Sequence, residues 1–275
     1  MNFVVQDFTG VYGEQAFVQR FKDACHCEGN DFCYIDCSGV NGTDCYCDSE
    51  AEGFLVGMLA KYPPSGIHFF DSGNYHYMSK IWTGKITEPF TLVVFDHHPD
   101  MQPPRFGDIL SCGSWVKEAL DSNKFIHNVV LIGVADKLAT EVQTDESVDF
   151  ARYAERVAFI TESEVCRLCQ DGNALPQKVL AMVGESLPVY ISIDKDVLCE
   201  KDAVTNWDQG SLDVATLKKI IAALASSHKI IGVDICGERA RDFAGDEYHT
   251  VQEADSLNSD LNCELADFLA RITSS

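Results

Sequence analysis

Short apolar runs alternate along the chain with longer segments whose apolar residues recur every three or four positions. The runs have the length of strands, and the later ones are rich in Val and Ile, as in strands buried on both faces of a parallel sheet. The predicted strands are 3–6, 32–35, 67–70, 90–95, 129–132, 157–160, 189–193 and 230–233.

Segments with helical spacing lie between these strands. Asp213 begins one of them and is predicted to be its N-cap. The polar, acidic stretch 245–262 is predicted to be a surface loop. The predicted helices are 14–24, 49–62, 114–121, 162–169, 175–186, 213–226 and 262–272. This alternation predicts an α/β fold with a mainly parallel sheet.

The length and charge of the chain limit the classes of protein to which it can belong. Residues 1–275 contain no long linker, low-complexity tract or repeat, so a single domain is predicted. No apolar run approaches the ~20 residues of a membrane span, and the N-terminus lacks the features of a signal peptide. A net charge of -22 disfavours nucleic acid and anionic membranes as partners. We therefore expect a cytoplasmic protein that binds no nucleic acid and no membrane.

Twelve cysteines are many for such a protein, and six of them lie between Cys25 and Cys47. Without a secretion signal, a disulfide framework is disfavoured. The C-x-C pairs of this stretch do not match the usual C-x2-C spacing of zinc or iron–sulfur sites. Cys166 and Cys169 have that spacing, but they lie in a predicted helix and lack a second pair. Reduced thiols packed as small hydrophobic groups are the simpler interpretation, and a metal site in this stretch stays open.

The strongest chemical signal directly follows the apolar run 90–95. There the chain reads Asp-His-His-Pro-Asp, and alternate residues of an extended segment point to one side. Asp96, His98 and Asp100 are therefore predicted to converge. Two carboxylates and one imidazole are suitable ligands for a divalent metal between the hard and borderline classes.

A second acidic pair, Asp194 and Asp196, follows another predicted strand. The carboxyl ends of parallel strands share one edge, where open α/β sheets bind ligands. Clustered carboxylates repel one another unless cations neutralise them, so two metals are predicted. Such a pair can supply a hydroxide that attacks a guanidinium, amidine or amide carbon. The acidic and imidazole groups expected at this edge are Asp71, His76, Asp96, His98, Asp100, Asp136, Asp194, Asp196 and Glu238.

These motifs resemble those of the ureohydrolase superfamily, which contains arginases, agmatinases and formimidoylglutamases. Its D-x-H-x-D and S-x-D-x-D motifs are similar to residues 96–100 and 192–196, and its D-I-x-E segment resembles 234–238. Order and spacing agree over about residues 66–240, whereas the cysteine-rich part, 1–60, shows no match. The resemblance implies an atypical arginase-like hydrolase with two Mn²⁺ ions. It also implies a three-layer α/β sandwich whose mainly parallel sheet of about eight strands is flanked by helices.

The resemblance further implies roles for individual residues. The ligands of one metal would be His76, Asp100, Asp194 and Asp196. The ligands of the other would be Asp96, His98, Asp194 and Asp196. Glu238 would face the substrate and orient its reacting group, and together with Asp96 it would form the catalytic set.

The sequence departs from the ureohydrolase pattern where the substrate is expected. Segment 111–115 lacks the histidine that arginases use to shuttle protons, and segment 205–210 replaces a T-G-T-P run. We therefore expect a small-molecule substrate other than arginine. The residues predicted to bind it are Ser111, Ser114, Trp207 and Asp208. Whether the chain forms a homo-oligomer stays open.

Two other functions stay open. The Asp-His-His triplet is also typical of DHH phosphoesterases, which use paired manganese on phosphodiesters, although Asp100 and the second acidic pair would have no role there. The missing shuttle histidine is also compatible with a protein that keeps the fold and metals but only binds a ligand.

Overall fold

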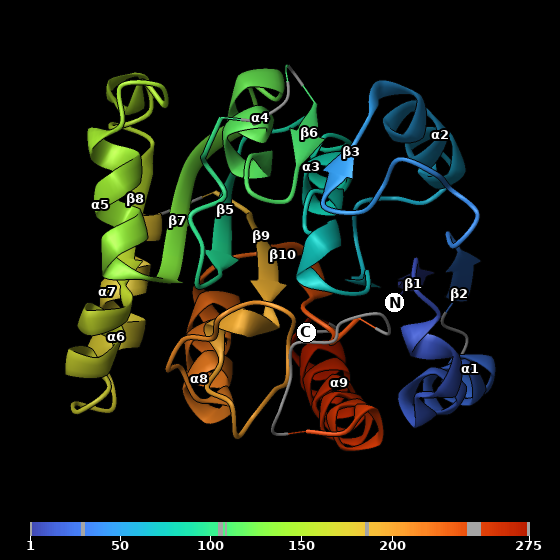
Figure 1. Cartoon of the computed structure of the whole chain (residues 1–275). Coiled ribbons are helices and arrows are strands. Elements are labelled where there is room, and N and C mark those ends of the chain that lie inside the picture. Colours follow the sequence, from blue (N-terminus) through green and yellow to red (C-terminus); the bar gives the residue numbers. More distant parts are fainter. Residues whose placement is uncertain are drawn as a thin grey trace.

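The computed structural model describes residues 2–28, 31–103, 107, 109–184, 187–240 and 249–273. Its centre is an eight-stranded sheet with the order β2-β1-β4-β10-β9-β5-β7-β8, in which all neighbouring strands are parallel (Figure 1). These strands are Asn2–Asp7 (β1), Asp31–Asp36 (β2), Ile67–Phe69 (β4), Phe90–Phe95 (β5), Ile126–Val134 (β7), Val157–Thr161 (β8), Val189–Asp194 (β9) and Ile230–Cys236 (β10). A separate antiparallel pair joins β3 (Tyr46–Cys47) to β6 (Leu110–Ser111).

Helices cover both faces of the sheet. The α-helices are Ala16–Glu28 (α1), Ser49–Leu59 (α2), Met78–Thr83 (α3), Trp115–Ser122 (α4), Asp136–Thr144 (α5), Glu162–Leu168 (α6), Ala174–Val183 (α7), Val214–Ser227 (α8) and Val251–Thr273 (α9). Short 3-10 helices are Val11–Glu14 (η1), Gly73–Tyr75 (η2), Phe150–Arg152 (η3) and Lys195–Val197 (η4). Figure 1 shows α8, α9 and α1 on one side of the sheet and α2, α3 and α4 on the other.

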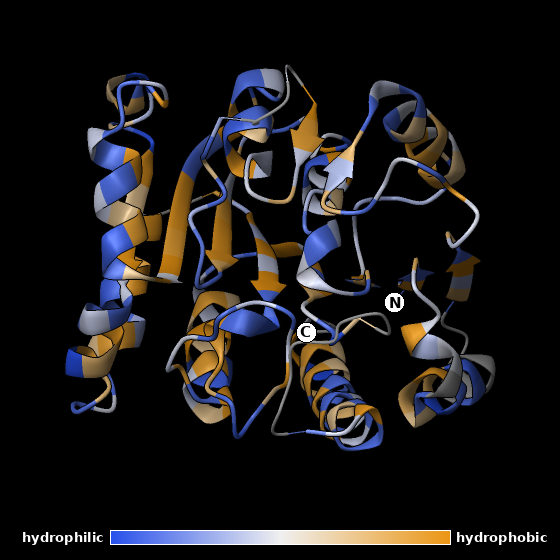
Figure 2. Cartoon of the chain, viewed as in Figure 1, coloured by the Kyte–Doolittle hydropathy of each residue, from blue (hydrophilic) through white to orange (hydrophobic). Residues whose placement is uncertain are grey.

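The alternation of side chains along each buried strand creates two cores. In β5, Val93 and Phe95 belong to the core that includes residues of α1, α6, α7, α8 and α9, whereas Leu92 and Val94 belong to the core that includes residues of α2 to α5. Figure 2 shows that the central strands are the most uniformly hydrophobic elements, as expected for a sheet covered on both faces. The observed three-layer α/β sandwich confirms the predicted fold class.

All eight predicted sheet strands are present, and Asp213 caps α8 by accepting a hydrogen bond from the amide of Thr216 at 2.9 Å. The loop prediction for 245–262 is wrong from Val251 onward, since α9 begins there; residues 245–248 lie outside the described residues. Thr250 and Glu253 explain this start. The Glu253 amide donates to the Thr250 hydroxyl at 3.2 Å, and the Thr250 amide donates to the Glu253 carboxylate at 2.8 Å, which forms a capping box.

The cysteine-rich N-terminal part contributes to the same sheet, because β1 pairs with both β2 and β4. Cys37 and Cys47 are free thiols buried in one of the two cores. Among the described side chains of this part, no cysteine joins a group of three potential metal ligands. The side chains of Cys25 and Cys27 lie outside the described residues. Within the described ranges, no helix is long and apolar enough to cross a bilayer.

Candidate metal centre

The acidic and imidazole residues converge at the carboxyl ends of the neighbouring central strands β5 and β9. Asp96 directly follows β5, Asp194 ends β9, and Asp196 lies in η4 just beyond it. His76 follows η2 in the connection between β4 and α3. The parallel arrangement therefore brings together residues that are far apart in the sequence.

One group of ligands surrounds the imidazole of His76. Its Nδ1 lies 3.0 Å from an oxygen of Asp96, 3.1 Å from one of Asp100 and 3.5 Å from one of Asp194. The other ring nitrogen, Nε2, lies 2.9 Å from the hydroxyl of Ser192, which fixes the orientation of the ring. All four metal-ligand candidates in this group are buried.

A second group surrounds His98. Its Nδ1 lies 2.9 Å from Oδ2 of Asp196 and 3.6 Å from Oδ1 of Asp96. Its Nε2 lies 3.2 Å from Oδ1 of Asp208. The two oxygens of Asp96 thus face different imidazoles, Oδ2 toward His76 and Oδ1 toward His98. Asp96 is the carboxylate shared by both groups.

Convergence of Asp96, His98 and Asp100 does not arise from an extended segment, as the spacing alone suggested. The strand ends at Phe95, and Asp100 has a left-handed backbone with φ 48°. The turn is held by the His98 amide, which donates to Asp96 at 2.6 Å, and by the indole of Trp115, which donates to Asp100 at 2.7 Å. The three side chains therefore meet by means of a turn.

The groups of the site shift one another's pKa values. Burial opposes the positive charge of His76 and His98, but the adjacent carboxylates outweigh it and raise both pKa values. Burial opposes ionisation of Asp96 as well, yet the two imidazoles lower its pKa. Burial and the negative charge of Asp96 raise the pKa of Asp100 to about 7, and burial with neighbouring aspartates raises that of Asp196. Protons thus balance the clustered charge, and a divalent cation could replace them.

The donor set fits a divalent metal. His76 Nδ1 is buried and lies within ion-pair distance of three carboxylates, yet it satisfies the geometry of a hydrogen bond with none of them. A buried ring nitrogen aimed at carboxylate oxygens is the arrangement of a metal ligand. The mixture of imidazole and carboxylate donors around this nitrogen is also suitable for a divalent metal.

These groups form the floor of a cavity of about 400 Å³. Asp96, His98, Asp100, Asp194 and Asp196 line its floor. The described residues that line the walls are Cys45, Tyr46, Gly73, Pro99, Gln102, Pro103, Ser111, Cys112, Gly113, Leu138 and Trp207. The cavity therefore combines an acidic floor with largely apolar walls.

The four predicted substrate contacts occupy different places. Trp207 and Ser111 line the cavity. Ser114 is fully buried behind it, where its hydroxyl accepts from the Ser111 amide at 3.0 Å and stabilises the turn before α4. Asp208 is largely exposed and contacts the outer nitrogen of His98. Ser114 is thus placed to support the loop, and Asp208 to hold the ring of His98.

Glu238 lies next to the site but does not line the cavity among the described residues. Its carboxylate accepts hydrogen bonds from Gln15 at 2.9 Å and Asn262 at 2.7 Å and forms an ion pair with Lys195. Both members of this ion pair are fully buried. Gly237, with φ 91°, turns the chain after β10, so the alternation of the strand does not continue to Glu238. This placement differs from the expected orientation toward the substrate.

A model of the arginase family matches residues 68–238, which include every candidate metal ligand predicted from the sequence. The chain belongs to the arginase family. This membership agrees with the resemblance to the ureohydrolases and separates the chain from the DHH phosphoesterases.

Relatives of this arginase-family protein share its fold at low identity. An uncharacterised protein from Thermotoga maritima is 29% identical over 234 residues, which cover 85% of this chain and 78% of the relative. The solved structure of a proclavaminate amidino hydrolase from Streptomyces clavuligerus is similar with a TM-score of 0.68 at 18% identity, covering 98% of this chain and 92% of that one. An arginase from Bacillus cereus is similar with a TM-score of 0.66 at 12% identity, covering 97% and 98%. At such identities the likeness of the structures establishes the fold.

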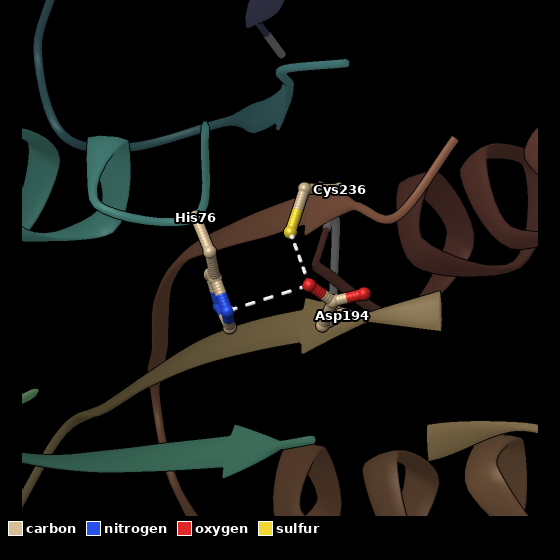
Figure 3. A group of neighbouring side chains, drawn as sticks. All are labelled: His76, Asp194 and Cys236. Atoms are coloured by element: carbon tan, nitrogen blue, oxygen red, sulfur yellow. Dashed lines mark hydrogen bonds and ion pairs between the residues drawn. The ribbon is translucent and has the colours of Figure 1, made fainter. Parts of the chain in front are cut away.

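Sequence reasoning did not single out Cys236. It ends β10 and lies beside Asp194 in the register between β9 and β10, with its thiol 3.3 Å from Oδ2 of Asp194 (Figure 3). The signal that could have found it is the position of a cysteine two residues after Asp234, at the end of a predicted strand. Candidate ligands also lie at the ends of the neighbouring strands β9, with Asp194, and β5, with Asp96.

Proposed function

We propose that this protein is a hydrolase that uses two divalent metal ions to cleave a C–N bond in a guanidino, amidino or amide small molecule. The observation that carries the proposal is Asp96, whose two oxygens face two different imidazoles. A carboxylate shared by two groups of ligands suits a pair of neighbouring cations, and such a pair supplies a hydroxide nucleophile at neutral pH when it is bound.

The distances support a slightly different division of ligands from the one that the resemblance implies. The proposed ligands on one side are His76, Asp96, Asp100 and Asp194. Those on the other are Asp96, His98 and Asp196. Oxygen and imidazole donors of this kind are suitable for manganese, the metal that we propose by analogy with the family.

The cavity supports a cationic substrate. Its floor is rich in aspartate, and a guanidinium or amidinium group is attracted to such a surface. The indole of Trp207 lies at the wall, where it can stack on a planar cation. Asp208 holds the outer nitrogen of His98 and so fixes the ring that faces Asp196. Glu238 is proposed to position η4 through Lys195, which lies between Asp194 and Asp196.

Metal analysis with a substrate panel tests this function. Purified wild-type protein is expected to bind close to two divalent ions and to release an amine or urea from at least one guanidino, amidino, formimino or amide compound. Asp96→Asn is expected to lose metal and activity together. Asp136→Asn is the matched control, because Asp136 also follows a strand of the sheet but, among the described residues, its carboxylate accepts hydrogen bonds from Thr161 and Ser163 and joins no group of potential metal ligands.

The outcomes separate the three functions considered. Hydrolysis of bis-p-nitrophenyl phosphate without action on any C–N bond would replace the proposed activity by phosphoesterase activity. Two bound metals with no hydrolysis of either class would favour a ligand-binding protein. Full metal content in Asp96→Asn would contradict the assignment of the site.

A further inference from the structure

The thiol of Cys236 lies inside the candidate metal centre, yet it belongs to neither proposed set of ligands. Its Sγ lies 3.3 Å from Oδ2 of Asp194, and the same oxygen lies 3.5 Å from Nδ1 of His76 (Figure 3). Ligand atoms of these three residues all lie within 4.8 Å of one another, and all three residues are buried. The cysteine is therefore one member of a compact group that can hold an ion.

A second observation points to a ligand at this place. His76 Nδ1 is buried and makes no hydrogen bond, although Ser192 holds the opposite nitrogen and so directs Nδ1 toward the carboxylates of Asp96, Asp100 and Asp194. Asp234 and Cys236 share one side of β10, since they are two residues apart. The side chain of Asp234 is engaged with His68 and Tyr190 further along the strand, whereas the thiol reaches the ligand group.

We propose that Cys236 is a thiolate ligand of the metal on the His76 side of the centre. This proposal rests on the proposed two-metal function and makes the two positions chemically unequal. Sulfur favours zinc, whereas carboxylate and imidazole alone suit manganese. The position that includes Cys236 would thus prefer the softer metal, and the position around His98 would prefer manganese. The incoming cation displaces the thiol proton, which leaves to solvent.

A simpler role for the thiol is that of a hydrogen-bond donor that orients Asp194. Two substitutions separate the roles. Cys236→Ser keeps a donor but removes the sulfur ligand. Cys236→Asp removes the sulfur and supplies an anionic oxygen ligand in its place. Cys37→Ser is the matched control, because Cys37 is an equally buried thiol that joins no potential metal-binding group in the described part of the chain.

The experiment measures metal–sulfur bonding directly. The full chain is loaded with Co²⁺ and its absorption is recorded in the near ultraviolet, where sulfur-to-cobalt charge transfer absorbs. The Zn²⁺-loaded protein is measured by X-ray absorption, where a bonded sulfur lies about 2.3 Å from zinc. Wild type and Cys37→Ser are expected to show both signals, and Cys236→Ser and Cys236→Asp to show neither. When zinc and manganese compete for the protein, the preference of both Cys236 variants for zinc should be roughly tenfold weaker than that of wild type. This is the lower end of the effect expected when a residue that hydrogen-bonds to a metal ligand is removed.

Each result has one meaning. Two metals in wild type without a sulfur signal, or a sulfur signal that persists in Cys236→Asp, would overturn the thiolate proposal and leave the two-metal function intact. Wild type that binds no divalent ion would overturn the two-metal function itself. If Cys236→Ser fails to fold, as shown by circular dichroism, Cys236→Asp and the wild-type spectrum still decide whether this sulfur bonds to the metal.

Discussion

Asp194 is confined by two glycines that bring the backbone against its carboxylate. A Cβ atom on Gly73 would lie 2.8 Å from Oδ2 of Asp194, and one on Gly237 would lie 2.4 Å from Oδ1. Real side chains do not fit at such distances. The two glycines therefore allow the connections after β4 and β10 to enclose the carboxylate, whose Oδ2 lies toward His76.

Gly237→Ala is expected to weaken metal binding. The residue has φ 91°, so a Cβ atom adds backbone strain of about 1–2 kcal/mol and also displaces Asp194. We expect metal affinity to fall roughly 10–100-fold, as for the loss of other groups that orient a ligand. Titration with Mn²⁺ against a chelating dye measures this. Gly10→Ala is the control, since Gly10 has φ 82° but open space at its Cβ position; it should lose stability and keep its metal affinity.

Metal affinity is expected to depend on pH through Asp100. Because burial and Asp96 raise the pKa of this carboxyl to about 7, it stays protonated at pH values where an ordinary aspartate is ionised. A metal must displace that proton, so affinity should fall as pH falls through about 7, by up to about tenfold per pH unit for each proton displaced. Metal-binding isotherms at about pH 8 and pH 6 measure the change in affinity. Equal affinity at both values would show that Asp100 is already ionised or is no ligand.

At this scale the spacing of residues 96–100 predicted that their acidic and imidazole side chains converge, but it did not predict the geometry by which they do so. The run Asp96-His97-His98-Pro99-Asp100 predicted convergence from an extended geometry, whereas the structure reaches it by a turn with Asp100 in the left-handed region. The turn is held by the Trp115 indole, which donates to Asp100, and by the His97 amide, which donates to Asp196 on the neighbouring connection. Such long-range partners cannot be read from local spacing.

Among the elements, a buried network joins the site to the edges of the fold. Lys195 in η4 forms an ion pair with Glu238 after β10, and Asn262 of α9 donates to the same carboxylate. Gln15, just before α1, donates to Glu238 and accepts from Asn262 at 3.0 Å. The network therefore ties the segment that carries Asp196 to both terminal parts of the described chain.

Lys195→Met is expected to destabilise the protein by about 3–5 kcal/mol, because it leaves the buried charge of Glu238 without the ammonium group that pairs with it. The double variant Lys195→Met, Glu238→Gln should recover much of this loss, since the amide still accepts from Gln15 and Asn262. Denaturant unfolding measures the free energy of unfolding of the single and the double variant. Lys218→Met is the control: its ion pair with Glu264 is partly exposed, and its loss should change stability by no more than about 1 kcal/mol.

The double variant also decides the role of Glu238. If Glu238 only positions η4 through Lys195, the folded double variant should bind metal more weakly than wild type, because Asp196 lies in η4, and its activity should return at saturating metal. If the carboxylate contacts the substrate, as the resemblance implied, the double variant should bind metal and be inactive. The spacing of the late D-I-x-E segment could not distinguish these roles, because Gly237 adds one residue and reverses the direction of the next side chain.

Long, regular elements were predictable and short or polar ones were not. The central strands β4, β5 and β9 are buried on both faces, so their apolar runs are unambiguous. Strands β3 and β6 have two residues each and exist through their mutual pairing. Helix α9 begins within a polar stretch because a capping box, rather than an apolar stripe, fixes its start.

At the scale of the whole molecule, the site exists only when the sheet is assembled. Its candidate ligands extend from His76 to Cys236 and lie at the ends of β9 and β10 or in the connections after β4, β5 and β9. These four strands are neighbours in the sheet, but their order in space differs from their order in the chain. An unfolded chain therefore cannot present the same ligands together, and a bound metal should favour the folded state.

Removal of metal is accordingly expected to lower the melting temperature. A ligand that binds only the folded state at about 100 times its Kd contributes about 2.7 kcal/mol, which corresponds to roughly 5 °C or more for a protein of this size. Calorimetry after chelation, and again after addition of Mn²⁺, measures the loss and its recovery. Asp136→Asn should respond like wild type, and Asp96→Asn, which lacks the carboxylate shared by both groups, should respond to neither treatment. A wild-type melting temperature indifferent to chelator and metal alike would mean that the aspartates are balanced by protons and imidazoles alone, and that the centre does not hold metal.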